Sequence, residues 1–335
     1  MQDTIQHNLE DLIQASGRII ITSHFKPDGD AMGSSLGLYH YLKSAGIESK
    51  VIVPSDYADF LHWMPGNNKV LIYEEDEIQC NIEIAHADFI FCLDFNALHR
   101  INVMGEHVEA SSARCILIDH HQDPHDFDDE RFIEIGASST CELIYRYITT
   151  HLDQSYMNKH VGECIYTGLI TDTGSFRFAS TSSYTLRIAA DLMDLGVVPD
   201  AIYQLLFDQN KLSRLQLLGH LLSTNLEIIE KGKVALGYLT IDDIERFDSI
   251  TGDTEGFVNY GLGIAGVKMS ALIIDRGPIV KMSFRSSGEF PCNIFSAENF
   301  SGGGHKNAAG GISHDGLDDT LKKFKEVIKN YRDYL

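Results

Sequence analysis

The sequence has little proline, no closely spaced cysteine pair and no long hydrophobic run, and each absence excludes a class of protein. Only 7 prolines occur among 335 residues, which excludes a Pro-rich disordered tail. The six cysteines lack the CxxC spacing of redox and zinc sites, so we expect buried, reduced thiols. No stretch approaches the roughly 18 apolar residues of a membrane helix, and the polar N-terminus does not resemble a signal peptide. We therefore expect a cytoplasmic protein with no membrane partner.

Positive charge is also scarce. The chain has 27 Lys and Arg against 48 Asp and Glu, which gives a formal net charge of −21. Affinity for long nucleic acids depends on many cationic contacts with phosphates, so a long duplex is excluded as the main partner. Short oligonucleotides and phosphorylated nucleotides are compatible with this charge, because bound metal ions or a cationic pocket can make the electrostatic potential positive at the binding site.

Three short apolar runs predict the strands of an α/β domain. They cover residues 18–22, 89–93 and 115–118, and they are too short for helices. Helical patterns at 31–45 and 139–149 separate them, as expected for a parallel sheet that is covered on both faces. The sequence therefore predicts a larger, parallel-sheet α/β domain.

The pattern changes near residue 191. Leu and Ile then recur at three- and four-residue spacing, which predicts a long amphipathic connecting helix. Beyond it, a second and smaller α/β domain is predicted from three strands and a closing helix, at residues 234–240, 267–274, 279–284 and 317–334. We therefore expect a first domain, a helical linker and a second domain at residues 1–190, 191–226 and 227–335.

Side chains that bind metals follow each predicted strand of the first domain. Residues 171–175, between an apolar segment and a strand-like segment at 176–178, add a fourth group. The candidates are His24, Asp28, Asp30, Asp94, Asp119, His120, His121 and Asp172. A single Asp is usually a cap or turn former, and a single His usually packs. Because ligands of open α/β sheets bind beyond the carboxyl ends of strands, four such segments together favour one shared site.

Several carboxylates at one sheet edge require positive charge. Two carboxylates about 4 Å apart repel by roughly 4 kcal/mol at an effective dielectric of about 20. Two divalent cations neutralise four of them, and oxygen and imidazole ligands suit Mn²⁺ or Mg²⁺ better than a structural Zn²⁺. Such a pair of ions activates a shared water for in-line attack on phosphorus. The pattern therefore predicts two divalent ions, with Mn²⁺ preferred over Mg²⁺, and phosphoester hydrolysis.

The motifs of the first domain resemble those of the DHH-family phosphoesterases. They read HFKPDGDAMGSSLGL at 24–38, LDFN at 93–96, DHH at 119–121 and TDTGSFRF at 171–178. The resemblance implies that one ion binds His24, Asp28 and Asp94 and that the other binds Asp30, Asp94, His120 and Asp172. It also implies that His121 acts as a donor or general acid at the scissile phosphate, with Asp119 as its support.

The second domain carries a second set of motifs, FRSSGEF at 284–290 and SGGGHKNAAGG at 301–311. A Gly run is most often a flexible turn, and a lone Arg is most often solvated. These motifs, however, resemble the DHH-associated domain of NrnA-type oligoribonucleases and RecJ exonucleases. The resemblance implies a substrate-binding domain after a catalytic, metal-binding one, with the substrate held by Arg285, Gly302, Gly303, Gly304 and His305.

The NrnA-type resemblance implies hydrolysis of short oligoribonucleotides to mononucleotides, together with removal of a phosphate from 3'-phosphoadenosine 5'-phosphate. A short, acidic chain disfavours RecJ-type digestion of long DNA, and the GGGH motif disfavours a family II inorganic pyrophosphatase. A phosphodiesterase for cyclic or linear dinucleotides is an alternative. A non-catalytic nucleotide-binding module is another, but it predicts a broken metal position, and all six are filled. The sequence is also compatible with a homodimer.

Overall fold

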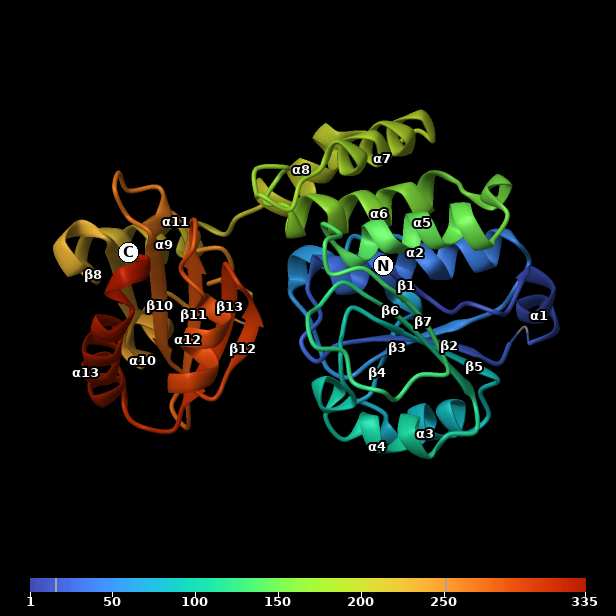
Figure 1. The fold of residues 1–335 in the computed structure, drawn as a ribbon, viewed down its shortest axis with the longest axis horizontal. Coiled ribbons are helices and arrows are strands. Elements are labelled where there is room, and N and C mark those ends of the chain that lie inside the picture. The colour runs from blue at the N-terminus through green and yellow to red at the C-terminus, as the bar shows by residue number, and fades with distance from the viewer. Residues whose placement is uncertain (16, 251) are drawn as a thin grey trace. The chain divides into compact units, whose positions relative to one another are not determined.

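The computed structural model describes residues 1–15, 17–250 and 252–335, which form two compact units (Figure 1). The first unit comprises residues 1–209 and the second residues 210–335. All six cysteines lie in the described part, where they are buried and unbridged, as predicted. Within that part, no helix is both long and apolar enough to cross a membrane.

A seven-stranded sheet forms the centre of the first unit, in the order β1-β7-β6-β5-β2-β3-β4. Its strands are β1 Gln2–Asp3, β2 Ile19–Ser23, β3 Lys50–Val53, β4 Leu71–Ile72, β5 Phe89–Leu93, β6 Arg114–Asp119 and β7 Glu130–Ile133. All neighbours are parallel except β1, which pairs antiparallel with β7. The three predicted strands correspond to β2, β5 and β6, so the predicted parallel sheet is confirmed.

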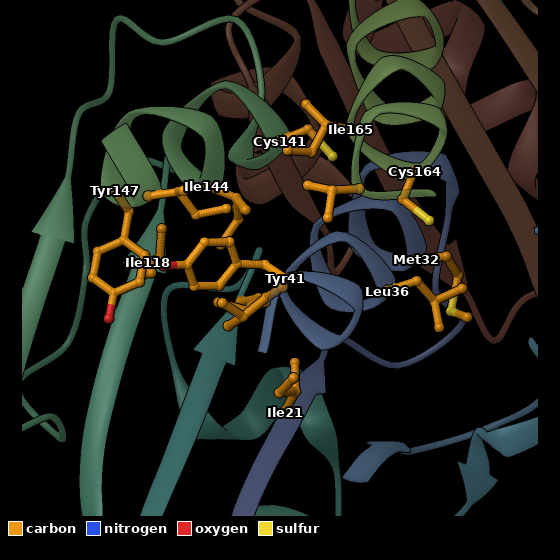
Figure 2. Packing of buried hydrophobic residues seen from close by; sticks show 14 of the residues in the cluster. Ile21, Met32, Leu36, Tyr41, Ile118, Cys141, Ile144, Tyr147, Cys164 and Ile165 are labelled. Carbon is orange, nitrogen blue, oxygen red and sulfur yellow. The ribbon is translucent and has the colours of Figure 1, made fainter. Parts of the chain in front are cut away.

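Helices cover both faces of this sheet, because successive side chains of the buried strands point to opposite sides. The helices are α1 Leu9–Gln14, α2 Gly29–Ser44, α3 Glu77–Ala85, α4 Met104–Ala110, α5 Thr140–His151, α6 Lys159–Asp172, α7 Ser183–Asp194 and α8 Pro199–Phe207. Ile21 packs in the core with α2, α5 and α6, whereas Ile20 packs in the core with α3 and α4. Figure 2 shows the first of these cores, with Ile21 and Ile118 facing side chains of the helices.

The growth of the sheet changes direction between β2 and β5. After β2 the chain adds β3 and β4 on one side, and then returns to add β5, β6 and β7 on the other. Loops that leave the carboxyl ends of two such neighbouring strands diverge, which leaves a crevice where α/β sheets bind ligands. His24 and Asp94 directly follow β2 and β5, so the fold places both of them at this point.

Glycines allow α2 and α6 to pack closely beside the crevice. A Cβ on Gly33 of α2 would lie 2.6 Å from the carbonyl oxygen of Cys164 in α6. A Cβ on Gly168 of α6 would lie 2.8 Å from a carboxylate oxygen of Asp30. Because α2 begins next to Asp28 and α6 ends at Asp172, this close packing fixes the distance between two segments that carry candidate ligands.

Residues 176–178 do not form the predicted strand. Gly174, Ser175 and Phe176 have φ angles of 56°, 62° and 62°, so the chain turns tightly in the left-handed region just after α6. Asp172 therefore reaches the site from the end of a helix, and only the other three segments reach it from strand ends.

The prediction of a single long helix over residues 191–226 is also wrong. The segment contains the end of α7, then α8, and then α9 Leu212–Thr224. Gly196, with φ of 96°, follows α7, and Pro199 opens α8 at a position where its missing N–H is not needed. A second break at residues 208–211 contains the boundary between the two units.

The second unit is built on a six-stranded sheet in the order β12-β13-β11-β10-β9-β8. Its strands are β8 Leu226–Ile229, β9 Val234–Leu239, β10 Met269–Asp275, β11 Val280–Ser286, β12 Gly303–His305 and β13 Ala308–Ser313. Only β9 and β10 are parallel. The predicted strands correspond to β9, β10 and β11, and the glycine-rich run forms the hairpin of β12 and β13.

Helices pack on both faces of this second sheet as well. They are α9, α10 Ile241–Arg246, α11 Asn259–Leu262, α12 Cys292–Asn299 and α13 Leu317–Val327. Phe284 packs with α12 and α13 in an aromatic core, and Leu272 packs with α9 and with Phe257 and Val258, which precede α11, on the opposite face. The predicted closing helix consists of α13, which is followed directly by a 3-10 helix at Ile328–Tyr334.

Five shorter 3-10 helices lie in the connections of the two units. They are Asp59–Leu61, Asn67–Lys69, Leu98–Ile101, Gln154–Tyr156 and Glu230–Gly232.

Candidate metal centre

One group of candidate ligands surrounds His24, which directly follows β2. Its Nε2 atom lies 3.8 Å from Oδ2 of Asp28 and 3.5 Å from Oδ2 of Asp94. Asp28 is also the N-cap of α2, since its Oδ1 accepts hydrogen bonds from the amides of Asp30 and Ala31. The ordinary capping role therefore uses one oxygen of Asp28 and leaves the other directed toward His24.

A second group surrounds His120, which directly follows β6. Its Nε2 atom lies 3.8 Å from Oδ2 of Asp30 and 3.5 Å from Oδ2 of Asp172. The same nitrogen lies 3.5 Å from Oδ1 of Asp94. All six predicted metal ligands thus come together at the carboxyl edge of the sheet, from β2, α2, β5, β6 and α6.

Asp94 lies between the two groups, because its Oδ2 faces His24 and its Oδ1 faces His120. Its backbone has a φ of 63°, in the left-handed region that Asp and Asn tolerate better than most residues. It is only 2% exposed, so its carboxylate depends on neighbouring polar groups for its interactions.

The first turn of α5 supplies such groups, and the sequence did not point to it. The hydroxyl of Thr140 donates to Oδ1 of Asp94 at 2.9 Å. The amides of Thr140 and Cys141 donate to Asp30 at 2.6 and 2.8 Å. The one signal in the sequence is the Ser-Thr-x-Glu pattern at 139–142, which is typical of a helix N-terminus.

Asp119 and His121 form a pair next to these groups. Nδ1 of His121 lies 2.7 Å from Oδ1 of the fully buried Asp119 and 3.7 Å from Oδ1 of Asp94. A contact of this length fits a hydrogen bond in which Nδ1 donates to the carboxylate, and it fixes the orientation of the imidazole ring.

The carboxylates of the site oppose one another electrostatically. Burial raises the pKa of Asp30, and the charges of Asp94 and Asp172 raise it further. Burial likewise raises the pKa of Asp172, to about 6. Burial acts in the same direction on Asp94, but the nearby imidazoles of His120 and His24 outweigh it and hold the pKa of Asp94 well below its usual value. Ion-free protein thus concentrates negative charge here and favours any cation that enters.

Imidazole protons take the place of such cations when none is bound. Burial lowers the pKa of His24, but Asp28 and Asp94 outweigh burial and raise it to about 10. The same carboxylate effect raises the pKa of His120 well above its usual value. Both rings therefore tend to hold a proton in ion-free protein, and a divalent ion would have to displace it.

The spacing of the ligand atoms fits metal ions better than direct hydrogen bonds. The nitrogen–oxygen distances of 3.5 to 3.8 Å exceed those of hydrogen bonds. Two ligands held about 2.1 Å from one ion lie about 3.0 to 3.4 Å apart, only slightly closer than these atoms. Together with the oxygen and imidazole composition, this spacing fits divalent cations in both groups.

The candidate substrate residues Arg285 and His305 of the second unit lie on one face of its sheet. Arg285 of β11 and His305 of β12 both pair with Ala308 of β13, so the three side chains form one row on the same face. Arg285 is half-buried, and its Nη1 donates to the carbonyl of Phe284 at 2.9 Å.

The three glycines before His305 are not equivalent. A Cβ on Gly302 would lie 2.1 Å from the carbonyl oxygen of Gly310, and Gly304 has a φ of 137°. Both positions therefore need glycine for the packing and geometry of the hairpin. Gly303 pairs with Gly310 and has open space where a Cβ would lie. Gly303 therefore differs from the other two, because the hairpin itself does not require glycine there.

Two family profiles match the sequence in the two units. Residues 18–169 match the DHH family, N-terminal domain, and residues 232–331 match the DHHA1 domain. The first match contains every candidate metal ligand except Asp172, and the second contains Arg285 and the glycine-rich hairpin.

Relatives and solved structures match almost the whole chain. It is 31% identical to the bifunctional oligoribonuclease and PAP phosphatase NrnA of Thermus thermophilus, over 96% of this chain and 92% of the relative. It is 26% identical to the cyclic-di-AMP phosphodiesterase GdpP of Bacillus subtilis, over 98% of this chain but 50% of the relative. The structure of an exopolyphosphatase-related protein from Bacteroides fragilis superimposes with a TM-score of 0.92 at 41% identity, covering 97% of this chain and 95% of that one.

The repulsion within the site predicts that Asp172→Asn stabilises ion-free protein at pH 8. A carboxyl whose folded pKa of about 6 exceeds its ordinary 3.8 opposes folding once it is ionised. That penalty is full above about pH 6 and disappears as the pH falls toward 4. Urea unfolding in a chelator should therefore show a gain of about 1 kcal/mol at pH 8 that shrinks toward pH 4.

Asp194→Asn, at the exposed end of α7, controls for the loss of one negative charge. An Asp172→Asn protein that is less stable than the wild type at pH 8 in chelator would contradict the repulsion.

Proposed function

This chain belongs to the DHH family, and on that premise we propose that it is a metal-dependent phosphoesterase that hydrolyses short oligoribonucleotides to mononucleotides and dephosphorylates 3'-phosphoadenosine 5'-phosphate. The observation that carries the proposal is the placement of Asp94, whose two oxygens face the imidazoles of two separate ligand groups. The NrnA relative and the complete set of six ligand positions support the same activity.

The proposal includes two divalent ions, Mn²⁺ or Mg²⁺. His24, Asp28 and Asp94 would hold one, and Asp30, Asp94, His120 and Asp172 the other. When bound, such ions neutralise the phosphate oxygens and lower the pKa of a coordinated water. The charge of the four carboxylates then becomes favourable, because it is matched by the charge of the ions.

The residues of the chain contribute positioning and proton transfer. Asp119 holds the ring of His121 through Nδ1, which directs Nε2 away from the buried carboxylate. A charged His121 donates the Nε2 proton to the oxygen that leaves phosphorus, and that oxygen departs as a hydroxyl group. Because Asp119 is fully buried, it stabilises the charged ring without competition from water.

The second unit would bind the part of the substrate that does not react. Arg285 and His305 share one face, where their cationic or donor groups suit a phosphate. Gly303 allows the backbone to approach the same ligand. The net charge of −21 favours short substrates, because a long polyanion would be repelled outside this local region.

The similarity to GdpP favours a phosphodiesterase for cyclic or linear dinucleotides as the second candidate. The two candidates share the metal centre and differ in the substrate that is accepted. A substrate panel therefore separates them, and it should contain a linear diribonucleotide, 3'-phosphoadenosine 5'-phosphate, a cyclic dinucleotide, pyrophosphate and long single-stranded DNA.

Asp94→Asn should reduce hydrolysis of the diribonucleotide and of 3'-phosphoadenosine 5'-phosphate by about 1,000-fold or more. The amide keeps the size of the carboxylate but removes the negative charge that both ligand groups share. Release of mononucleotide and of phosphate in Mn²⁺ measures the effect, and Asp194→Asn should retain wild-type rates. Wild-type protein that cleaves only pyrophosphate, or only the cyclic dinucleotide, would overturn the proposed substrates.

Arg285→Ala should lower kcat/KM for the diribonucleotide by a factor equivalent to about 1.5 to 3 kcal/mol, the usual value of a hydrogen bond to a charged group. Hydrolysis of a minimal phosphodiester such as bis(p-nitrophenyl) phosphate should change little. Lys281→Ala is the matched control, because Lys281 lies on the same face of β11, four residues away. Equal losses on both substrates would remove Arg285 from substrate recognition.

A further inference from the structure

The first turn of α5 binds two of the buried carboxylates at once. Thr140 is fully buried, and it contacts Asp30 through its amide and Asp94 through its hydroxyl. Cys141 adds a second amide to Asp30, so that each oxygen of Asp30 accepts one backbone hydrogen bond. A single helix turn thus connects the carboxylate of α2 to the carboxylate that follows β5.

The amides of this turn are available because a helix does not use its first N–H groups internally. Ser139 caps α5 by accepting from the amide of Glu142, which leaves the amides of Thr140 and Cys141 for Asp30. The positive end of the helix dipole favours a carboxylate at this place. The hydroxyl contact with Asp94 is different, because it depends on the side chain of Thr140 and not on the backbone.

We propose that Thr140 is a positioning residue that sets the orientation of Asp94. The proposal rests on the two-ion site proposed above. The hydroxyl donates to Oδ1, the oxygen that faces His120, and so occupies one of its two acceptor directions. One direction of Oδ1 is left for the His120 group, while Oδ2 faces the His24 group. The hydrogen bond therefore makes Asp94 serve both groups and disfavours chelation of one ion by both oxygens.

The position of Thr140 is itself fixed by a buried polar contact. Glu142 accepts hydrogen bonds from the hydroxyls of Ser138 and Thr185, at 2.7 and 2.8 Å. Thr185 belongs to α7, so this carboxylate joins the start of α5 to the neighbouring helix. A displacement of Thr140 toward or away from Asp94 would break these contacts, which makes the turn a rigid support.

Thr140→Val tests the hydroxyl directly, because valine keeps the shape of threonine and both backbone contacts with Asp30. The matched control is Thr167→Val in α6, where the hydroxyl of an equally buried threonine bonds only to the carbonyl of Glu163. Isothermal titration of the metal-stripped full chain with Mn²⁺ gives the number of ions and their affinities. We expect Thr140→Val to weaken Mn²⁺ binding by about 10- to 100-fold and Thr167→Val to leave it within about 3-fold.

A second readout separates positioning from general stability. In saturating Mn²⁺, Thr140→Val should lower kcat for the diribonucleotide while KM changes little, because the substrate groups of the second unit are untouched. If the valine variant does not fold, the pair Thr140→Ser and Thr140→Ala replaces it, since the two differ only in the hydroxyl. The serine variant should then bind Mn²⁺ at least about 10-fold more tightly than the alanine variant.

The outcomes distinguish this inference from the proposed function. If the wild type binds Mn²⁺ and Thr140→Val binds it equally well, only the role of Thr140 is overturned. The same conclusion follows if Thr140→Ala binds Mn²⁺ as tightly as Thr140→Ser. Wild-type protein that binds no divalent ion overturns the proposed function, and the role of Thr140 with it.

Discussion

Asp28, Asp30, Asp94 and Asp172 repel one another across a small space in which Asp30 and Asp94 are buried, and this repulsion determines the electrostatics of the site. Burial and mutual repulsion raise the pKa of Asp30 and Asp172, while His24 and His120 acquire raised pKa values from the same carboxylates. A stable fold has no need of such an arrangement, since each carboxylate costs free energy when its charge is unmatched. In the proposed function, divalent cations remove that cost by matching the charge of the carboxylates.

The fold holds these side chains together against their repulsion. The sheet contributes His24, Asp94 and His120 at the point where its growth changes direction, and close packing of α2 and α6 at Gly33 and Gly168 brings in the remaining carboxylates. The N-terminus of α5 adds hydrogen-bond donors from outside the ligand set. The ligands therefore have little freedom to separate, which is the preorganisation that a metal-dependent enzyme requires.

Much of this arrangement was predictable from the sequence, because apolar runs and the ligands that follow them are local signals. The strands β2, β5 and β6 were found from such runs, and the parallel sheet then brought six predicted ligands to one edge. Thr140 was not found, since a threonine at the start of a helix looks like an ordinary cap residue and its contacts with Asp30 and Asp94 span 110 and 46 residues. The structural role of two glycines was not found either. Gly302 and Gly304 are needed by the hairpin itself, and only the three-dimensional pairing of β12 with β13 reveals this.

The central claim is that the six ligand side chains hold two divalent ions that share Asp94. Anomalous diffraction from crystals grown with Mn²⁺, recorded at the manganese absorption edge, tests it most directly. The account predicts two manganese peaks, one beside His24, Asp28 and Asp94 and one beside Asp30, Asp94, His120 and Asp172. Crystals at saturating Mn²⁺ that show no peak among these side chains, or a single peak that both oxygens of Asp94 chelate, would contradict it.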